Sequence, residues 1–157
     1  MNHRTNAKPH IERGVAAVEF AIILPIFLLM LALPLYFGRI LWHYTAAQKA
    51  AYDAARYIAS VPRSEMKDPN KIGKVVALAK TIVATETAEL NSGSVPVGIS
   101  VICDGLECLG LNVPTTVTVG VQVTVDDIFF PAITSGMAGL NSSNLLNANI
   151  SYAYVGI

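Results

Sequence analysis

The feature that most constrains this chain is an apolar run from Val15 to Gly38, in which Glu19 is the one charged residue. A helix that crosses a membrane needs about 20 residues, and the run meets this length. A carboxylate inside such a helix is costly unless it stays hydrated near the interface or finds a partner. The central question about function is therefore what Glu19 pairs with.

The charges on either side of the run predict its orientation. Arg4, Lys8 and Arg13 precede it against Glu12 alone, and Arg39 beyond it weakens this asymmetry without reversing it. Positive charge favours the cytoplasmic side of a membrane helix. A cleaved secretory signal fits less well, because its apolar region spans about 7–15 residues and ends at a small-x-small site. We therefore expect a single-pass membrane helix with a cytoplasmic N-terminus and an exported C-terminal part.

Gly14 directly precedes the run and gives Glu19 a candidate partner. If the chain is cut after Gly14, Val15 becomes an N-terminal amine, and Glu19 lies four residues along the same helix. The carboxylate can then neutralise that amine, either its own or a neighbour's, in surroundings of low dielectric constant. The alternative is a glutamate that lies close enough to the interface to remain hydrated. The residues alone leave both interpretations open.

The segment around Gly14 and Glu19 resembles the class III signal of type IV-like prepilins, and most closely that of the TadE-like proteins of tight-adherence (Flp-type) pili. The residues that carry the resemblance are Arg13-Gly14-Val15-Ala16-Ala17-Val18-Glu19-Phe20-Ala21-Ile22-Ile23-Leu24-Pro25. It continues in an alanine-rich segment, Gln48-Lys49-Ala50-Ala51-Tyr52-Asp53-Ala54-Ala55-Arg56-Tyr57. It covers about the first third of the chain.

The resemblance implies a minor pilin or pseudopilin that acts in surface attachment and biofilm formation. A prepilin peptidase would cut between Gly14 and Val15, and Glu19 and Phe20 would then guide subunit docking. The implied partners are that peptidase, other pilin or pseudopilin subunits, the pilus assembly platform and the membrane. The implied location is the inner (cytoplasmic) membrane or the pilus itself, with the C-terminal domain periplasmic or extracellular.

The sequence also allows two alternative functions. One is an uncleaved single-pass membrane protein with an exported binding domain. The other is a pseudopilin of type II secretion, but such proteins usually begin the mature chain with phenylalanine or methionine, and Val15 stands at that position here.

The rest of the pattern predicts an α+β fold of pilin-like layout. We expect a cytoplasmic basic leader over residues 1–14, a transmembrane helix over 15–38, a continuation of that helix over 39–61, and an exported head over 62–157. Small and apolar residues recur three or four positions apart on one face of the continuation, which indicates a packed side. They are Ile40, Tyr44, Ala47, Ala51, Ala54 and Ile58.

The head is predicted to hold a second helix and a three- to four-stranded antiparallel sheet. Asp68-Pro69 is typical of a helix start, and Asn91-Ser92-Gly93 of a helix end. Residues 116–125 alternate strictly between valine and other residues, which indicates a strand with one buried face. Shorter strands are expected over residues 97–103 and 149–155.

Two further pairs of residues are candidate sites. Cys103 and Cys108 flank an Asp-Gly turn, and no histidine lies near them. A structural zinc site takes four ligands, so we predict a local disulfide formed in an oxidising compartment. Phe129 and Phe130 precede a proline and are candidate contacts for a partner, although they could equally close the core or touch a membrane surface.

The sequence offers no case for an enzyme. It has no glycine-rich phosphate loop and no Gly-x-Ser-x-Gly motif, and its formal net charge of zero gives no reason to expect nucleic-acid binding. Asp126 and Asp127 lack a second acidic cluster. We therefore predict no cofactor, no metal and no small-molecule substrate. The chain is instead expected to be the substrate of a membrane peptidase and of a disulfide-forming oxidase.

Overall fold

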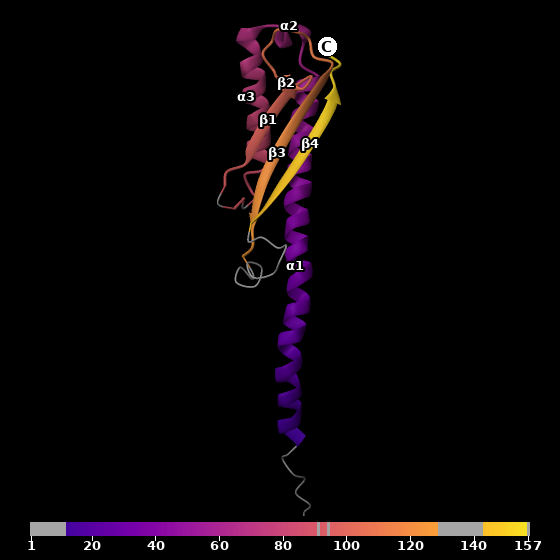
Figure 1. Ribbon diagram of the computed structural model, residues 1–157, viewed down its shortest axis with the longest axis vertical. Helices are drawn as coiled ribbons and strands as arrows, with labels where there is room; N and C mark the ends of the chain where they lie inside the picture. The colour runs from indigo at the N-terminus through magenta and orange to yellow at the C-terminus, as the bar shows by residue number, and fades with distance from the viewer. Residues whose placement is uncertain (1–11, 91, 94, 129–142, 157) are drawn as a thin grey trace, which may run out of the picture. The chain divides into compact units, whose positions relative to one another are not determined.

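The computed structural model describes residues 12–90, 92–93, 95–128 and 143–156. The chain divides into two compact units, Met1–Phe37 and Gly38–Ile157. One helix, α1 (Glu12–Ala59), supplies residues to both (Figure 1).

The described residues of the first unit form the N-terminal part of α1. This part holds the segment long and apolar enough to cross a membrane, with a mean hydropathy of 2.6 over an 18-residue window of which none is buried. Pro25 and Pro34 lie inside the helix. Each removes one backbone hydrogen bond, a loss that membrane helices tolerate when neighbouring groups compensate.

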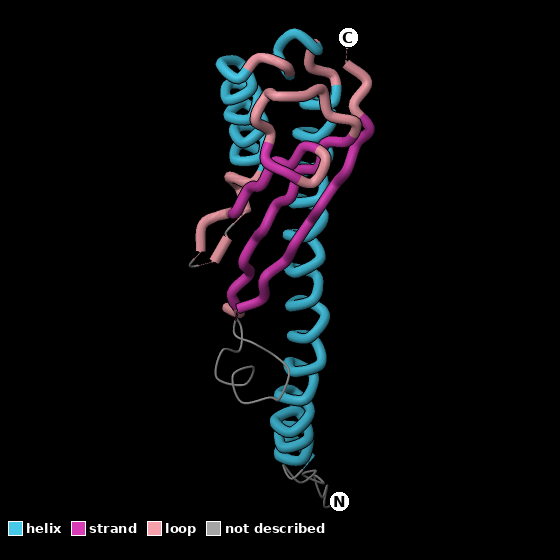
Figure 2. The backbone as a smooth tube through the Cα atoms, turned by 45° about the horizontal axis from the view of Figure 1, so that its top comes forward, coloured by secondary structure: helices cyan, strands magenta, loops and turns pink. Residues whose placement is uncertain are grey.

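The second unit contains the C-terminal part of α1, two further helices and one sheet. The helices are α2 (Arg63–Met66) and α3 (Pro69–Glu86). The strands are β1 (Gly98–Cys103), β2 (Leu106–Glu107), β3 (Thr116–Asp126) and β4 (Ser143–Ala153). All neighbouring strands are antiparallel, and their order across the sheet is β2-β1-β3-β4, as the labels of Figure 1 show. Figure 2 shows the same strands in magenta beside the helices. The predicted α+β class, with a long N-terminal helix and a three- to four-stranded antiparallel sheet, is confirmed, and the sheet has four strands.

One hydrophobic core joins α1, α3 and the inner face of the sheet. The alternating valines of β3, from Val117 to Val125, are all buried, as their period of two predicts. Facing them is an alanine-rich side of α1 whose members have at most 2% of their surface exposed: Ala47, Ala50, Ala51, Ala54, Ala55, Ile58 and Ala59. The small side chains allow close approach to the helix, so the packed side of α1 contributes to the core of its own domain.

Helix α3, which corresponds to the second helix predicted from the sequence, begins at the predicted position. Asp68 is its N-cap, and one carboxylate oxygen accepts a hydrogen bond from the Asn70 backbone N–H at 2.9 Å. Pro69 occupies the first turn, where its missing N–H is not needed. The helix ends at Glu86, before the expected Asn-Ser-Gly stop. The Thr87 hydroxyl donates to the Val83 carbonyl at 2.7 Å and so satisfies a group of the last turn.

The C-terminal segment closes the end of α1. The backbone N–H groups of Val155 and Gly156 both donate to the Ala59 carbonyl at 3.2 Å, and the Tyr154 hydroxyl donates to the Val61 carbonyl at 2.7 Å. The last carbonyls of a helix lack partners within the helix. These bonds therefore fix the end of the sheet to the end of α1.

Candidate functional site

Gly14 lies inside α1 and is exposed, so the helix begins before the predicted cleavage point. A Cβ atom built on Gly14 would meet nothing within 4 Å. The glycine is therefore not required by packing in this unit. A peptidase that needs an extended backbone would have to unwind the first turn of the helix.

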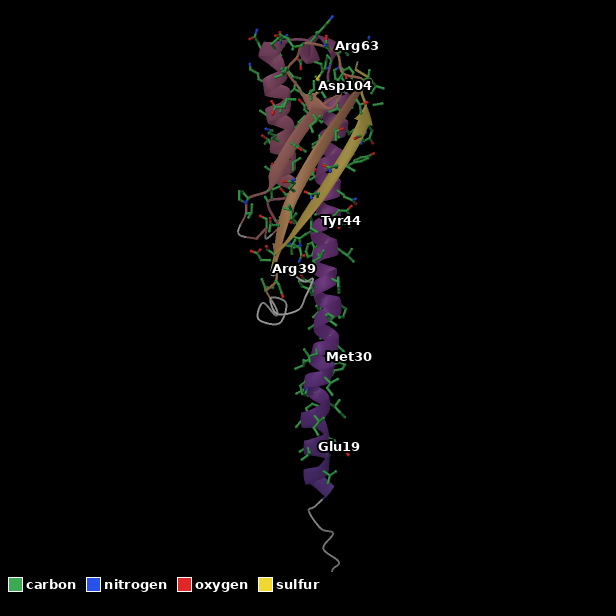
Figure 3. All side chains as sticks on the ribbon, viewed as in Figure 1. Glu19, Met30, Arg39, Tyr44, Arg63 and Asp104 are labelled. Atoms are coloured by element: carbon green, nitrogen blue, oxygen red, sulfur yellow. A yellow bond between two sulfur atoms is a disulfide. The ribbon has the colours of Figure 1, made fainter. Side chains whose placement is uncertain are left out.

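Glu19 lies one helical turn after Val15, on the N-terminal part of α1 (Figure 3). Residues four apart share one side of a helix. Val15, Val18 and Phe20 are 55%, 61% and 64% exposed, so Glu19 stands on an open apolar surface. Within the described residues its carboxylate forms no ion pair. The nitrogen of Val15 is a peptide amide in the uncut chain, so the proposed amine partner does not yet exist.

Cys103 and Cys108 form the predicted disulfide. Between them, Asp104 and Gly105 both have positive φ angles, of 51° and 86°, and connect β1 to the two-residue strand β2. Two consecutive positive φ angles suit a tight hairpin turn, and aspartate and glycine are the residues that adopt them most readily. The disulfide therefore joins a hairpin that the local sequence already favours.

Asp104 also connects this hairpin to the start of β3, which the sequence did not reveal. Its carboxylate accepts hydrogen bonds from the Thr115 hydroxyl at 2.6 Å, from the Thr115 N–H and from the Thr116 N–H at 2.8 Å. The bonds from Thr115 and Thr116 lower the pKa of this carboxyl. The Asp-Gly signal located the turn, but only the fold brings residues eleven and twelve positions later next to it.

A charged cluster links α1 to α3. The Lys49 ammonium lies 3.8 Å from a carboxylate oxygen of Asp53 and 3.8 Å from one of Glu86. These distances suit ion pairs but are too long for hydrogen bonds. Burial, followed by the nearby Asp53 carboxylate, raises the pKa of Glu86, and Lys49 offsets this only in part. Ionisation of the Glu86 carboxyl is therefore less favourable in the folded cluster than in water.

Near the start of the second unit, Arg39 donates to the Asp126 backbone carbonyl at 3.0 Å. One turn later, His43 is 5% exposed, and its Nδ1 lies 2.8 Å from the Arg39 carbonyl oxygen. The Arg39 bond ties α1 to the end of β3, whereas the His43 contact lies within α1. Phe129 and Phe130, the candidate partner contacts, lie outside the described residues. The described part of the chain holds no group of three histidine, cysteine or acidic residues able to bind a metal ion.

The predicted site residues thus fall into separate sets. Gly14, Val15, Glu19 and Phe20 follow one another on α1 within the first unit. Cys103 and Cys108 belong to the second unit and serve its hairpin. No described geometry assembles either set into a catalytic centre.

Comparison with known proteins supports the resemblance of the N-terminal segment to TadE-like proteins. Residues 14–56 match the family described as TadE-like protein. The match begins at Gly14 and includes Glu19, the apolar run and most of the alanine-rich side of α1. No curated protein and no solved structure matches the chain.

Proposed function

We propose that this chain, whose residues 14–56 are TadE-like, is a minor pilin or pseudopilin of a tight-adherence pilus. The TadE-like family is associated with such pili and is not a family of enzymes. The observation that carries the finer proposal is the order of features on α1. Gly14 directly precedes the exposed apolar part of α1, and Glu19 lies one turn beyond the amine that a cut would create.

In this proposal the prepilin peptidase cuts between Gly14 and Val15 while the chain is anchored in the inner membrane. The new amine of one subunit then pairs with the Glu19 carboxylate of its neighbour. In surroundings of low dielectric constant an unpaired charge is expensive, so pairing favours the docked arrangement over a displaced one. Phe20 and the surrounding exposed apolar side chains supply contact area along the neighbouring helix.

The second unit would face the periplasm or the cell exterior. Its disulfide supports this placement, because such bonds form and persist in oxidising compartments. The domain limits proposed from the sequence follow from the same topology: leader 1–14, membrane helix 15–38, helix extension 39–61 and head 62–157.

The docking step is tested with Glu19→Gln and Glu19→Asp in cells that carry the full pilus system. Glu19→Gln removes the charge without removing the side chain, so cleavage should persist while the amount of the protein in sheared pili falls at least about tenfold. Glu19→Asp keeps the charge and should retain a measurable part of the incorporation. Equal incorporation of the wild type and Glu19→Gln would refute the docking role.

The processing step is tested separately with Gly14→Val and the matched control Gly38→Val. Both glycines lie in α1, and a Cβ atom at either would meet nothing within 4 Å, so neither change should disturb packing within its own unit. Gly14→Val should block removal of the leader, and Gly38→Val should leave it intact. Normal processing of Gly14→Val would contradict the proposed cleavage site.

A further inference from the structure

Strand β1 has an open edge over most of its length. On one side it pairs with β3 from Gly98 to Cys103, but on the other it pairs with β2 only at Ile102 and Cys103. If β2 continued in register, Cys108 would lie opposite Val101. Instead its sulfur is bonded to Cys103. The disulfide therefore coincides with the point where the chain leaves the edge, and no strand among the described residues pairs with Gly98 to Val101 on this side.

The register shows which backbone groups point to this edge. The Asp104 N–H donates to the Thr116 carbonyl of β3 at 2.9 Å, so the backbone of Asp104 faces β3. Successive residues of a strand face opposite neighbours. Val101 and Ile99 therefore direct their N–H and C=O groups to the open edge. Among the described residues, no other backbone group bonds to them.

A groove of about 370 Å³ runs along this edge. Helix α3 lies beside β1 and forms its other wall (Figures 1 and 2). The helix contributes Val76 and Lys80, the strand contributes Ile99 to Ile102, and Glu107 and Cys108 close one end. Lys80 is exposed and forms no ion pair within the described part of the chain. The groove thus combines a backbone edge, an apolar contact at Val76, the cation of Lys80 and, at one end, the carboxylate of Glu107.

We propose that this groove binds an extended peptide segment of a partner protein, which adds to β1 as a strand in line with β2. The peptide backbone would bond to the N–H and C=O groups of Ile99 and Val101, the usual source of affinity when a strand adds to a sheet edge. An apolar side chain would contact Val76, and an acidic side chain would pair with Lys80.

The test uses the full-length, ¹⁵N-labelled protein in detergent micelles. The probe is a capped synthetic hexapeptide of alternating threonine and valine in which one threonine is replaced by aspartate. Addition of this peptide should shift the amide signals of Ile99, Val101 and Lys80, and should slow hydrogen exchange at Ile99 and Val101. A version with lysine in place of the aspartate should bind about fivefold more weakly. A version with N-methylated alternate amides should not bind.

Protein variants separate this groove from other surfaces. Lys80→Glu should reverse the preference between the two charged peptides, while Lys74→Glu, also exposed on α3 but outside the groove, should leave the preference unchanged. Ile99→Pro removes an outward N–H while sparing the bonds that Ser100 makes to β3, and should abolish binding. The proposal is overturned if no β1 signal shifts, if the N-methylated peptide binds equally well, or if Lys80→Glu keeps the original preference.

Discussion

At the scale of single residues, Asp104 and Glu86 show that folding can shift the pKa of a carboxyl group in either direction. The carboxylate of Asp104 accepts several hydrogen bonds and is favoured in its charged form, whereas that of Glu86 is disfavoured by burial and by Asp53. The dependence of stability on pH therefore has opposite signs at the two sites. Both effects belong to the second unit and can be measured on the protein alone.

Asp104→Asn should lower the stability of the second unit at neutral pH. Asparagine tolerates the positive φ angle of this position, so the change tests the carboxylate and not the turn. Since folding lowers the pKa of Asp104 below its ordinary value of 3.8, the stability it provides is present above that value and is lost as the pH falls through the lower, folded-state pKa.

The measurement is the urea midpoint of the full-length wild type and Asp104→Asn, each in detergent, from pH 7 downward. The difference between the two proteins should be largest near neutrality and should shrink in acid. A difference that is constant over this range would mean that the carboxylate charge contributes nothing.

Glu86→Gln should have the opposite effect and raise stability at pH 7. Folding raises the pKa of Glu86 above its ordinary value of 4.5, so the favourable contribution is present below that value and is lost as the pH rises through the folded-state pKa. The glutamine removes this loss. Thermal unfolding should show a higher midpoint for the variant at pH 7 and a smaller gain at pH 4. Glu89→Gln, at an exposed position, is the control and should change neither value. A lower midpoint for Glu86→Gln at pH 7 would show that the contact with Lys49 outweighs burial.

At the scale of secondary-structure elements, the alanine-rich side of α1 determines how closely the helix approaches the sheet. Ala51 and Ala54 are fully buried in the same core as the valines of β3. A closely packed interior has little room for added methyl groups. This side of α1 should therefore tolerate larger side chains poorly, although it is apolar.

Ala51→Leu should destabilise the second unit by about 1–3 kcal/mol, the usual cost of overpacking a well-filled core. Ala77→Leu is the matched control, because Ala77 lies on an exposed position of α3. Chemical unfolding of the full-length proteins in detergent should give a loss for Ala51→Leu and a change within about 0.5 kcal/mol for the control. Equal effects of the two substitutions would contradict the tight packing of α1.

The elements that the sequence predicts well are those with an unbroken period. Strand β3 follows from its alternating valines, and α3 from its N-cap and its apolar stripe, since local chemistry and burial agree there. The sequence predicts that the last strand begins at Asn149, but β4 begins at Ser143. The prediction missed the first half of the strand because that half is rich in asparagine and places Leu145 and Leu146 on opposite faces. Pairing with β3, a tertiary effect, holds that half in the sheet.

Short elements and contacts between residues far apart in the chain could not be predicted from the sequence. The single turn of α2 lies within a stretch expected to be a polar connector, and β2 has only two residues. The bonds from Thr115 and Thr116 to Asp104, and the groove along β1, depend on which strands become neighbours. By contrast, the disulfide followed from two cysteines around one turn, because its geometry is local.

At the scale of the whole molecule, one helix serves two purposes. Its N-terminal part is an exposed apolar segment of membrane-spanning length, and its C-terminal part supplies one wall of the core of the second unit. The TadE-like match ends at residue 56, just before this helix ends. The described residues that follow α1 add a disulfide-linked hairpin and the groove that we propose to bind a peptide.

The central claim is that removal of the leader creates the partner of Glu19, so the peptide bond between Gly14 and Val15 is its most direct test. The protein should be expressed in membranes with active prepilin peptidase or with a catalytically inactive one, and its intact mass and N-terminal sequence measured. We expect a chain that starts at Val15 with the active peptidase and at Met1 with the inactive one. A chain that still starts at Met1 in the presence of active peptidase would contradict the account and favour an uncleaved membrane protein.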